Sequence, residues 1–289
     1  MVPVNGSADV LIEPTTETEA LEAIARSLTG VGRLGVAFSG GVDSSVLLAA
    51  AVRVLGPSRV VAVLGVSPSL AADERSAAHE VASVIGAALV EVTTDEGSLP
   101  AYQANDADRC FHCKNELFTR ISDEVVRQHA LDAVAYGENL DDAARSDRPG
   151  SRAAAEHRVL APLRDAGLDK AAVRRLARAW ALPCAEKPAA PCLASRIPHG
   201  SVVSPEKLRQ VEQAESGLRR LGLGDLRVRH HDEIARVELP GEDLARAAQE
   251  PLRSAVREVV LGAGFRYAVL DLGTMQPGAF TLTVLQGRA

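Results

Sequence analysis

Residues 34–55, LGVAFSGGVDSSVLLAAAVRVL, decide the fold of this chain. The run 34–38 is continuously apolar, as expected for a strand that is buried on both faces of a sheet. A helix predicted over 44–55 follows at once, so only the loop SGGVDS separates the strand from the helix. A strand that turns directly into a helix is the first half of a β–α–β unit and predicts a parallel sheet.

The same alternation continues to about residue 185. We expect further helices over 16–30, 71–85, 113–129 and 169–180, and further strands over 59–66, 88–93 and 132–136. This order predicts an α/β fold with a doubly wound parallel sheet, whose helices cover both faces. The ligand of such a fold binds beyond the carboxyl ends of the strands.

The pattern changes after a proline-rich segment at residues 182–200, LPCAEKPAAPCLASRIPHG. Beyond it we expect helices over 204–221 and 242–261, the second broken at Pro251, and strands over 226–230, 233–239 and 265–272. These elements predict a small C-terminal α+β domain. We therefore divide the chain into an α/β domain over 1–185, an active-site linker over 186–200 and a substrate or oligomerisation domain over 201–289.

The composition argues against some classes of function. The net charge of −6 over 289 residues argues against binding nucleic acid through bulk positive charge. No run of about 18 apolar residues is present, so we expect no transmembrane helix and no membrane partner. The first 15 residues lack the basic start and apolar run of a secretory signal. We therefore expect a cytoplasmic protein, whose four cysteines are ligands, reactive groups or buried thiols rather than disulfides.

The loop SGGVDS has the composition of a phosphate-binding site. Gly40 and Gly41 permit positive φ and let backbone N–H groups approach an anion closely. The start of the following helix adds positive potential at the same point. The hydroxyls of Ser39 and Ser44 supply further donors, and Asp43 is a candidate Mg²⁺ ligand against the leaving phosphates.

The loop is not a Walker motif, because no lysine lies between Val31 and Ala101. It resembles the SGGxDS signature of the ATP pyrophosphatase (PP-loop) superfamily, which has an adenine nucleotide alpha hydrolase-like fold. Enzymes of that superfamily place AMP on a substrate oxygen and release pyrophosphate. We therefore predict an enzyme that splits ATP at the α-phosphate; a glycine-rich turn without chemical meaning is the alternative.

Cys110 and Cys113 form a CxxC pair in the stretch RCFHC. This spacing serves zinc sites, redox pairs and iron–sulfur clusters alike. Cys192 lies in the proline-rich segment, and three thiolates can hold a 4Fe-4S cluster with one iron left open. A zinc site would need a fourth ligand, for which Cys184 and His112 are candidates; otherwise Cys184 is a packed thiol.

Three stretches together resemble the LarE family, the ATP-dependent sulfurtransferases of nickel-pincer cofactor synthesis: GVAFSGGVDSSVLLAAA, RCFHCKNELF and KPAAPCLASRIPHG. The resemblance also includes YGENLDDAARSDRPG, LAPLRDAGLDKAAVRRLARAWALP and LRVRHH, and it covers roughly residues 30–272. Its most specific part is CLASRIP, which begins at Cys192. Residues 273–280 do not match the family closely.

The resemblance implies a substrate and a reaction. The substrate is the small-molecule nucleotide pyridinium-3,5-biscarboxylic acid mononucleotide. ATP with Mg²⁺ adenylates one carboxylate, a sulfur nucleophile displaces AMP to leave a thiocarboxylate, and the cycle repeats on the other carboxylate. The family also implies a homo-hexamer, and it leaves the sulfide source unknown.

Family members differ in how they deliver the sulfur. One kind gives up the sulfur of a single cysteine, which becomes dehydroalanine, and the matching position is Cys192. The other kind binds a 4Fe-4S cluster through three cysteines, and its open iron carries the sulfide. Because Cys110 and Cys113 accompany Cys192, the chain resembles the cluster-bearing kind, with sacrifice of Cys192 as the alternative.

The resemblance carries further positions with it. Arg227 and Arg229 match arginines that contact the phosphate or carboxylates of the substrate, and alternate residues of a strand share one face, so the two can clamp an anion. A solvated basic strand edge is the other interpretation. Ser195 and Arg196 lie beside Cys192 and can orient the sulfur acceptor.

Acidic residues complete the candidate site. Three residues of this chain match acidic positions near the family's site, and each can equally be an ordinary surface acid: Glu215, Glu238 and Asp271. Three further acids follow the fourth strand, where one can bind Mg²⁺ or the run can simply begin a helix: Asp141, Asp142 and Asp147.

Two other enzymes and one non-enzyme fit parts of the pattern. A tRNA-thiolation enzyme can join a PP-loop to a three-cysteine cluster, but the acidic balance and the lack of an RNA-binding module disfavour it. An NAD-synthetase-like amide-forming enzyme would leave the three cysteines unexplained. A non-catalytic ATP-binding module is disfavoured by the intact Asp43 and Ser44.

Overall fold

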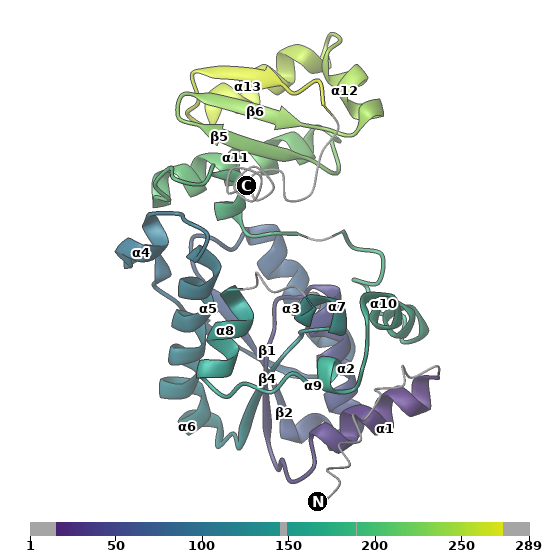
Figure 1. Ribbon diagram of the computed structural model, residues 1–289. Helices are drawn as coiled ribbons and strands as arrows, with labels where there is room; N and C mark the ends of the chain where they lie inside the picture. Colours follow the sequence, from purple (N-terminus) through teal and green to yellow (C-terminus); the bar gives the residue numbers. More distant parts are fainter. Residues whose placement is uncertain (1–15, 145–148, 189, 274–289) are drawn as a thin grey trace, which may run out of the picture. The chain divides into compact units, whose positions relative to one another are not determined.

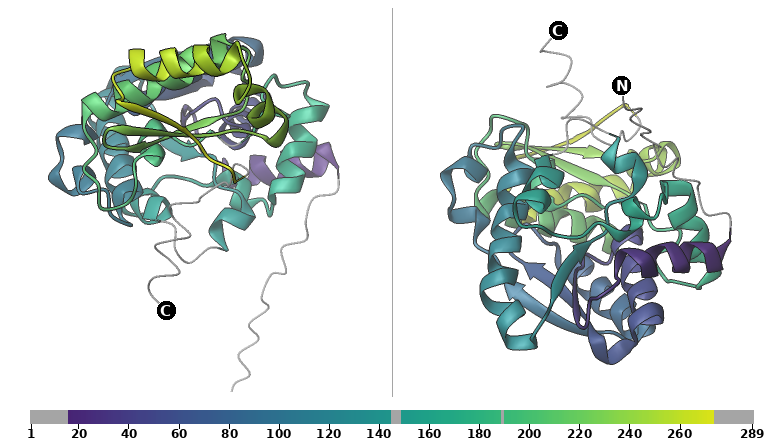
Figure 2. Two further views of the ribbon diagram at one scale, coloured as in Figure 1. Left: turned by 90° about the horizontal axis from the view of Figure 1, so that it is seen from above. Right: turned by 60° about the horizontal axis from the view of Figure 1, so that its bottom comes forward.

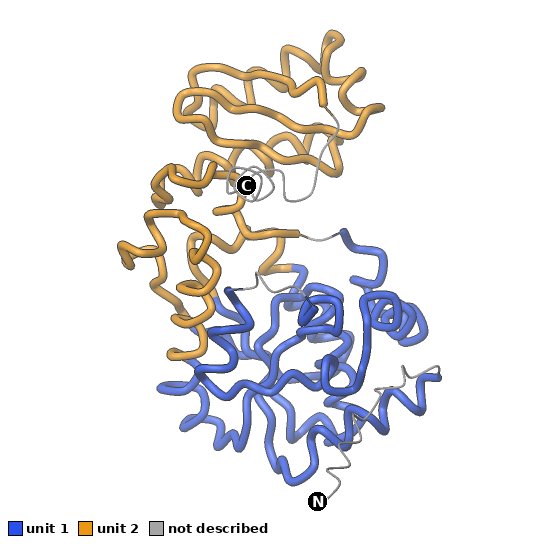
Figure 3. The backbone as a smooth tube through the Cα atoms, viewed as in Figure 1, with its two compact units in different colours: residues 1–65, 77–92, 121–189 blue, residues 66–76, 93–120, 190–289 orange. Residues whose placement is uncertain are grey.

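The computed structural model describes residues 16–144, 149–188 and 190–273. Contacts divide the chain into two compact units, each assembled from separate segments (Figure 3). The first unit comprises residues 1–65, 77–92 and 121–189, and the second comprises residues 66–76, 93–120 and 190–289. This division differs from the sequence-based one because two segments of the N-terminal half, 66–76 and 93–120, group with the C-terminal elements. The functional domains proposed over 1–185 and 201–289 stay a prediction.

A four-stranded sheet with strand order β3-β2-β1-β4 forms the centre of the first unit (Figure 1). Its strands are β1 (Leu34–Ala37), β2 (Val60–Val66), β3 (Ala88–Thr93) and β4 (Ala133–Tyr136). The central strand β1 is parallel to both of its neighbours, β2 and β4. This confirms the parallel α/β architecture, and each strand matches its predicted range within two residues.

Helices cover both faces of this sheet, as a doubly wound fold requires. The chain moves outward from β1 to β2 to β3, so right-handed crossovers place α2 (Val42–Leu55) and α3 (Ala72–Ile85) on one face. The return to β4 brings α6 (Val126–His129) to the other face, opposite α2 (Figure 1). Helices α1 (Glu17–Ser27) and α10 (Lys170–Ala179) pack against α2, whose residues 46–51 are all fully buried.

Several elements of the structure were not predicted. The helix expected over 113–129 begins four residues earlier, as α5 (Arg109–Arg120), and passes through a π-helical turn, Ile121–Val125, before α6. The sequence indicates α7 (Leu140–Ala143) only as a helix start at Asp141 and Asp142, and other short elements were not predicted, among them α4 (Pro100–Gln103), α8 (Pro149–Glu156), α9 (Pro162–Asp165) and the 3₁₀ turn η4 (Leu193–Arg196).

The second unit contains a three-stranded sheet with strand order β5-β6-β7, which confirms the small C-terminal α+β element. Strand β5 (Arg227–His231) is antiparallel to β6 (Ile234–Glu238), and β6 is parallel to β7 (Tyr267–Leu270). Helices α11 (Pro205–Arg220) and α13 (Leu252–Gly262) lie side by side on one face of the sheet (Figure 2), and a short helix, α12 (Gly241–Ala247), precedes α13. The apolar core lies between the helices and the strands and includes Val211, Val228 and Val260.

Candidate functional site

The loop between β1 and α2 has the geometry of an anion cradle. Gly41 is the N-cap of α2 and supplies no side-chain hydrogen bond, so the first N–H groups of a 14-residue helix have no capping side chain. The Ser44 hydroxyl folds back on the loop, 3.1 Å from the Gly41 carbonyl and 3.2 Å from the Ser39 hydroxyl. Gly40 has a φ of 70°, and a Cβ there would lie 2.9 Å from the Cα of Ala78. Both its conformation and its surroundings therefore require glycine.

The cradle lies at the switch point of the sheet. From β1 the chain leaves toward β2, and it later returns to β4 on the other side, so the loops after β1 and β4 diverge at the carboxyl ends of adjacent strands. Gly137 directly follows β4 and lies against the cradle, since a Cβ at this position would lie 2.6 Å from the Ser44 nitrogen. The loop after β4 is thus a second wall of the site, which the glycine pattern of the first loop alone does not reveal.

Asp43 is held by two residues that the sequence analysis did not single out. The Asn139 amide donates a hydrogen bond of 2.9 Å to one carboxylate oxygen, and the Lys170 ammonium forms an ion pair with the other. The Asn139 side chain also caps α7, since its oxygen accepts from the Asp142 nitrogen at 2.9 Å. The sequence offers one signal for each residue: Asn139 precedes an acidic helix start, and Lys170 directly follows a helix cap.

The acids after β4 have structural partners. Asp141 accepts a hydrogen bond of 3.0 Å from the Lys170 backbone nitrogen. Asp142 lies in the first turn of α7, where the helix dipole favours a carboxylate. Asp147 lies outside the described residues. Glu138 is 2% exposed and pairs with Arg164 at 3.0 Å, and together with burial it raises the pKa of Tyr136.

The three predicted cluster ligands all belong to the second unit. Cys110 and Cys113 lie in the first turns of α5, and Cys192 is the N-cap of η4. Burial raises the pKa of the Cys113 thiol, and Glu96, Cys192 and Cys110 raise it further. Desolvation also raises the pKa of the Cys192 thiol, Cys110 adds to it, and Arg109 opposes the shift. Because Cys110 acts on both other thiols and Cys192 acts on Cys113, the three cysteines form one neighbourhood, which we call the thiol site.

Arg109 and Asn105 join the parts of the thiol site. Arg109 is buried and donates to the Asn105 side-chain oxygen at 2.5 Å and to the Ala194 carbonyl at 2.9 Å. The Asn105 amide donates to the Pro198 carbonyl at 2.8 Å and to the Ser201 carbonyl at 3.0 Å. These bonds connect the start of α5 to the segment that follows Cys192, which explains how cysteines some 80 residues apart come together.

A buried acid lies next to the thiol site. Glu96 is 2% exposed and accepts a hydrogen bond of 2.5 Å from the Ser67 hydroxyl, while its other carboxylate oxygen is buried without a partner in the described residues. Tyr102, whose hydroxyl lies 2.5 Å from the Ser69 hydroxyl, has a pKa raised by burial and by Cys192. Sequence reasoning missed Glu96 because a single glutamate after a strand carries no motif.

The donor set of the thiol site suits an iron–sulfur cluster in type and number, since such clusters are held by cysteine thiolates. Within residues 16–144, 149–188 and 190–273, no group of three or more His, Cys, Asp or Glu side chains is already arranged to hold a metal ion. The fourth cysteine, Cys184, is 1% exposed and belongs to the apolar core.

Apart from Arg227, the arginines and acids carried over from the family lie in one network of ion pairs and hydrogen bonds, in which Ser195 links Arg196 to Arg229. Arg196 donates through two nitrogens to Glu215, at 2.9 Å and 3.1 Å, and to the Cys192 carbonyl at 3.2 Å. Glu215, which is 1% exposed, also accepts from Arg219 at 3.0 Å and from the Val228 nitrogen at 3.0 Å. Glu215 is therefore not an ordinary surface acid.

The second part of this network lies on the sheet. Arg229 is 5% exposed, pairs with Glu238 at 2.9 Å and donates to the Ser195 carbonyl at 3.0 Å. Arg236 joins Glu238 to Asp271. Burial of this kind excludes a solvated strand edge for Arg229.

Arg227 has a different environment from Arg229. Its partner Asp225 lies at 3.2 Å and is 41% exposed, so the ion pair is partly open to water. Burial lowers the pKa of Arg227, and the nearby Arg196 guanidinium lowers it further. An anion that approached Arg227 would relieve this unfavourable charge.

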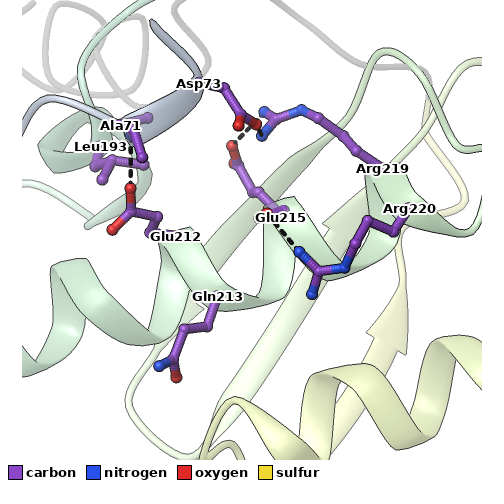
Figure 4. Close-up of a pocket in the computed structure, with 10 residues that line it drawn as sticks. Ala71, Asp73, Leu193, Glu212, Gln213, Glu215, Arg219 and Arg220 are labelled. Atoms are coloured by element: carbon purple, nitrogen blue, oxygen red, sulfur yellow. Dashed lines mark hydrogen bonds and ion pairs between the residues drawn. The ribbon is translucent and has the colours of Figure 1, made fainter. Parts of the chain in front are cut away.

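A cavity of about 290 Å³ lies beside the same network in the second unit (Figure 4). The start of α3 and helix α11 line it, and two of its charged side chains, Arg219 and Asp73, pair at 3.3 Å. Glu212 accepts a hydrogen bond of 2.7 Å from the Ala72 nitrogen. The cavity therefore borders the Arg196–Glu215 pair, since Glu215 is one of its lining residues.

Comparison with known proteins agrees with this geometry. The asparagine synthase family model matches residues 18–112, which include the cradle. The chain is 32% identical over 266 residues to the pyridinium-3,5-bisthiocarboxylic acid mononucleotide synthase of Lactiplantibacillus plantarum, covering 91% of this chain and 94% of that protein. It is 38% identical over 258 residues to the uncharacterized protein slr1717 of Synechocystis, covering 89% and 95%. No helix in the described part of the chain has the length and apolar character needed to span a bilayer.

Proposed function

Since this chain belongs to the LarE family of ATP-dependent sulfurtransferases, a branch of the PP-loop superfamily, we propose that it transfers sulfur to pyridinium-3,5-biscarboxylic acid mononucleotide. The product would be the bisthiocarboxylic acid mononucleotide named for the relative, an intermediate of nickel-pincer cofactor synthesis. The observation that carries this proposal is the anion cradle at the N-terminus of α2, combined with similarity along nearly the whole relative.

The first step is adenylation of a substrate carboxylate. A carboxylate oxygen attacks the α-phosphorus of ATP, the bond from the α-phosphorus to its bridging oxygen breaks, and pyrophosphate leaves. The N–H groups at the start of α2 and the Ser39 and Ser44 hydroxyls bind the negative charge of the phosphates. Asp43 is the acid that would hold Mg²⁺, a hard cation that prefers carboxylate oxygens.

The second step is sulfur transfer. A sulfur nucleophile attacks the carbonyl carbon of the acyl adenylate, the bond to the AMP oxygen breaks, and a thiocarboxylate and AMP remain. Adenylation makes this displacement feasible because AMP is a far better leaving group than the oxide of a free carboxylate. Two rounds convert both carboxylates.

Cys110, Cys113 and Cys192 are the proposed ligands of a 4Fe-4S cluster. Such a cluster, when bound, would carry the sulfide to be transferred. Support comes from three thiols in one unit, since Cys110 and Cys192 raise the pKa of Cys113, and Cys110 raises the pKa of Cys192. Arg109 places a positive charge beside these thiols and favours the thiolate form that metal binding needs. Sacrifice of the Cys192 sulfur is the alternative.

The arginines are proposed to orient the substrate. Arg227 suits an anion, because its partner Asp225 is partly exposed and Arg196 adds positive charge beside it. Arg229 and Arg196 are held by buried acids, so they would fix the shape of the site around Ser195 and Cys192. Glu215, Glu238 and Asp271 would thus act mainly by holding arginines in place. The assembly is proposed to be a homo-hexamer, with 201–289 as the substrate or oligomerisation domain.

The decisive experiment follows the fate of ATP. Purified protein is given MgATP with and without pyridinium-3,5-biscarboxylic acid mononucleotide, and the nucleotides and phosphates are separated. We expect AMP and pyrophosphate that depend on the substrate. Formation of ADP and orthophosphate would contradict the proposal, and release stimulated by tRNA instead of the mononucleotide would point to tRNA thiolation.

The sulfur source is tested separately. Anaerobically purified protein is analysed by absorption spectroscopy and iron counting, and three single Cys→Ala variants, at 110, 113 and 192, are compared with Cys184→Ala as the control. We expect a visible cluster band that the control keeps and each of the other variants loses. A colourless wild type whose Cys192 loses about 34 Da after turnover, the mass of one sulfur and two hydrogens, would show sulfur sacrifice instead, because the thiol becomes dehydroalanine.

A further inference from the structure

The phosphate loop contains no lysine, although ATP-binding loops often use one to reach the terminal phosphates. In Walker loops the lysine is part of the loop itself and contacts the β- and γ-phosphates. Here no lysine occurs between Val31 and Ala101, so the loop depends on backbone amides and hydroxyls. The fold instead brings a lysine from a distant helix to the same place, because the ammonium of Lys170 forms an ion pair with Asp43 of the loop.

The backbone of Lys170 is firmly held. Asp169 caps α10 by accepting a hydrogen bond from the Ala172 nitrogen at 2.6 Å, and Asp141 accepts from the Lys170 nitrogen at 3.0 Å. Helix α10 also packs along α2, the helix whose N-terminus forms the cradle. The base of the side chain is therefore fixed, while the side chain itself is 39% exposed and free to change its rotamer.

Asp43 does not need Lys170 to keep its position. The Asn139 amide holds the other carboxylate oxygen at 2.9 Å, and Asn139 is itself fixed because it caps α7. The Asp43 side chain is 21% exposed, so its ion pair with Lys170 is partly solvated and contributes little to stability. Phosphate oxygens carry more negative charge than one carboxylate, so an ammonium within reach gains by moving to them.

We infer that Lys170 is the phosphate-binding lysine of this site: it exchanges Asp43 for the β- and γ-phosphoryl oxygens of ATP and stays with pyrophosphate as that group leaves. The inference rests on the proposed function, because it assigns a residue to the same adenylation step. As the bond to the α-phosphorus breaks, negative charge builds up on the departing pyrophosphate, and the ammonium stabilises it there. The exchange also frees one Asp43 oxygen, while Asn139 keeps the carboxylate in place.

The assignment has a specific signature. AMP has no β- or γ-phosphate, so a lysine that serves these groups contributes to binding of ATP and pyrophosphate but not to binding of AMP. A lysine that only supports the fold would affect all three ligands together through the shape of the loop. The comparison of pyrophosphate with AMP therefore separates the two roles.

The test is calorimetric titration with three probes: the magnesium complex of α,β-methylene-ATP, magnesium pyrophosphate, and AMP. The proteins are the wild type, Lys170→Gln, Lys170→Arg, and Lys207→Gln as the matched control. Lys207 also pairs with an aspartate, Asp232 at 3.2 Å, but it belongs to the second unit. Thermal unfolding of each variant accompanies the titrations.

For Lys170→Gln we expect affinity for α,β-methylene-ATP and for pyrophosphate to fall about 10- to 100-fold, which corresponds to one charge-assisted hydrogen bond. Affinity for AMP should change less than about twofold, because AMP has no β- or γ-phosphate for the lysine to bind. Lys170→Arg should keep most of the affinity because it keeps the charge, and the control should match the wild type.

Two results would overturn the inference. Unchanged pyrophosphate affinity in Lys170→Gln would show that the lysine does not reach those phosphates. An equal loss for AMP and pyrophosphate, with a lower melting temperature, would show a structural role. In both cases the wild type still binds the ATP analogue, so the proposed function survives; a wild type that binds neither the analogue nor pyrophosphate would refute the proposed function itself.

Discussion

The anion cradle and the thiol site are built from different kinds of chemical group. The cradle uses backbone N–H groups, two hydroxyls and glycines that are required because a Cβ would collide with backbone atoms. The thiol site and its arginines use side chains that hold one another, such as Arg196 with Glu215 and Arg109 with Asn105. The first kind of site depends on close approach of the chain to itself, and the second depends on charge compensation. Substitutions should therefore damage the two sites through different mechanisms.

The largest effect is expected where charge compensation is complete. Glu215→Ala leaves the Arg196 guanidinium, 4% exposed, without its bidentate partner, and removal of one member of a buried ion pair costs about 3–5 kcal/mol. Urea unfolding measures the change. Glu258→Gln on the exposed side of α13 is the control and should shift the free energy of unfolding by about 0.5 kcal/mol or less. If both variants unfold alike, charge compensation does not hold this region together.

The cradle should respond to volume rather than to charge. Gly137→Ala would place a Cβ 2.6 Å from the Ser44 nitrogen and 2.8 Å from the Asp43 carbonyl carbon, and such overpacking costs about 1–3 kcal/mol. Because the atoms that must move belong to the cradle, binding of MgATP should weaken as well. Gly97→Ala is the matched control, since nothing lies within 4 Å of a Cβ at that position. Normal ATP binding by Gly137→Ala would show that the loop after β4 is not part of the ATP-binding site.

The core of the second unit should make stability dependent on pH. Burial, with a further contribution from Lys207, lowers the pKa of His230 from 6.5 to about 4, and Asp232 opposes the shift. Both ring nitrogens suit the neutral form, since one faces the Gln210 side-chain oxygen at 3.0 Å and the other accepts from the Asp232 nitrogen at 3.2 Å. Because the folded pKa is depressed, this stabilisation is complete above about pH 6.5 and is lost as the pH falls toward 4.

Urea unfolding between pH 7 and pH 4.5 measures this dependence. His230→Gln should lower stability at pH 7 and flatten the decline toward acid, because glutamine does not titrate. A variant whose stability declines as steeply as that of the wild type would show that other groups cause the acid sensitivity. The phosphate cradle has no such buried histidine among the residues described around it, so its ATP affinity should follow this titration only through global unfolding.

The smallest effect is expected at the acid beside the thiols. Burial is the main cause of the raised Cys113 pKa, and Glu96 is the next. Glu96→Gln removes that negative charge and should move the alkylation of Cys113 in the metal-free protein to lower pH. Mass spectrometry of the peptides separates Cys113 from Cys110, and Glu124→Gln on the exposed π-helical turn is the control. If the pH dependence of Cys113 alkylation stays the same, Glu96 does not influence the thiol site.

The sequence predicts the cradle well because all of its parts are local. The apolar run, the two glycines and the helix start lie within 22 consecutive residues, 34–55, so spacing alone determines how they meet. The long strands and helices were also predictable, since their hydrophobic periodicity extends over several turns. Single-turn helices such as α4 and α9 were missed because so few residues carry no period.

The partners of the site residues could not be predicted in the same way. Lys170 meets Asp43 across 127 residues, and Arg196 meets Glu215 through a fold that the local pattern does not specify. The family resemblance named Glu215 but left open whether it was a surface acid, and only its burial settles that. Glu96 had no signal at all, because its significance lies in a buried oxygen and not in a motif.

The second unit draws on three separate stretches of chain, 66–76, 93–120 and 190–289, and this interleaving limits how such a protein can be rearranged. A fragment cut at residue 190 would carry Cys192 but neither Cys110 nor Cys113, and it would lack the Asn105 and Arg109 that fasten its first turn. A gene fusion or recombination at that point would therefore not transfer a complete thiol site as one domain. We expect the proposed ATP-binding and sulfur-transfer parts to need expression and engineering as one chain.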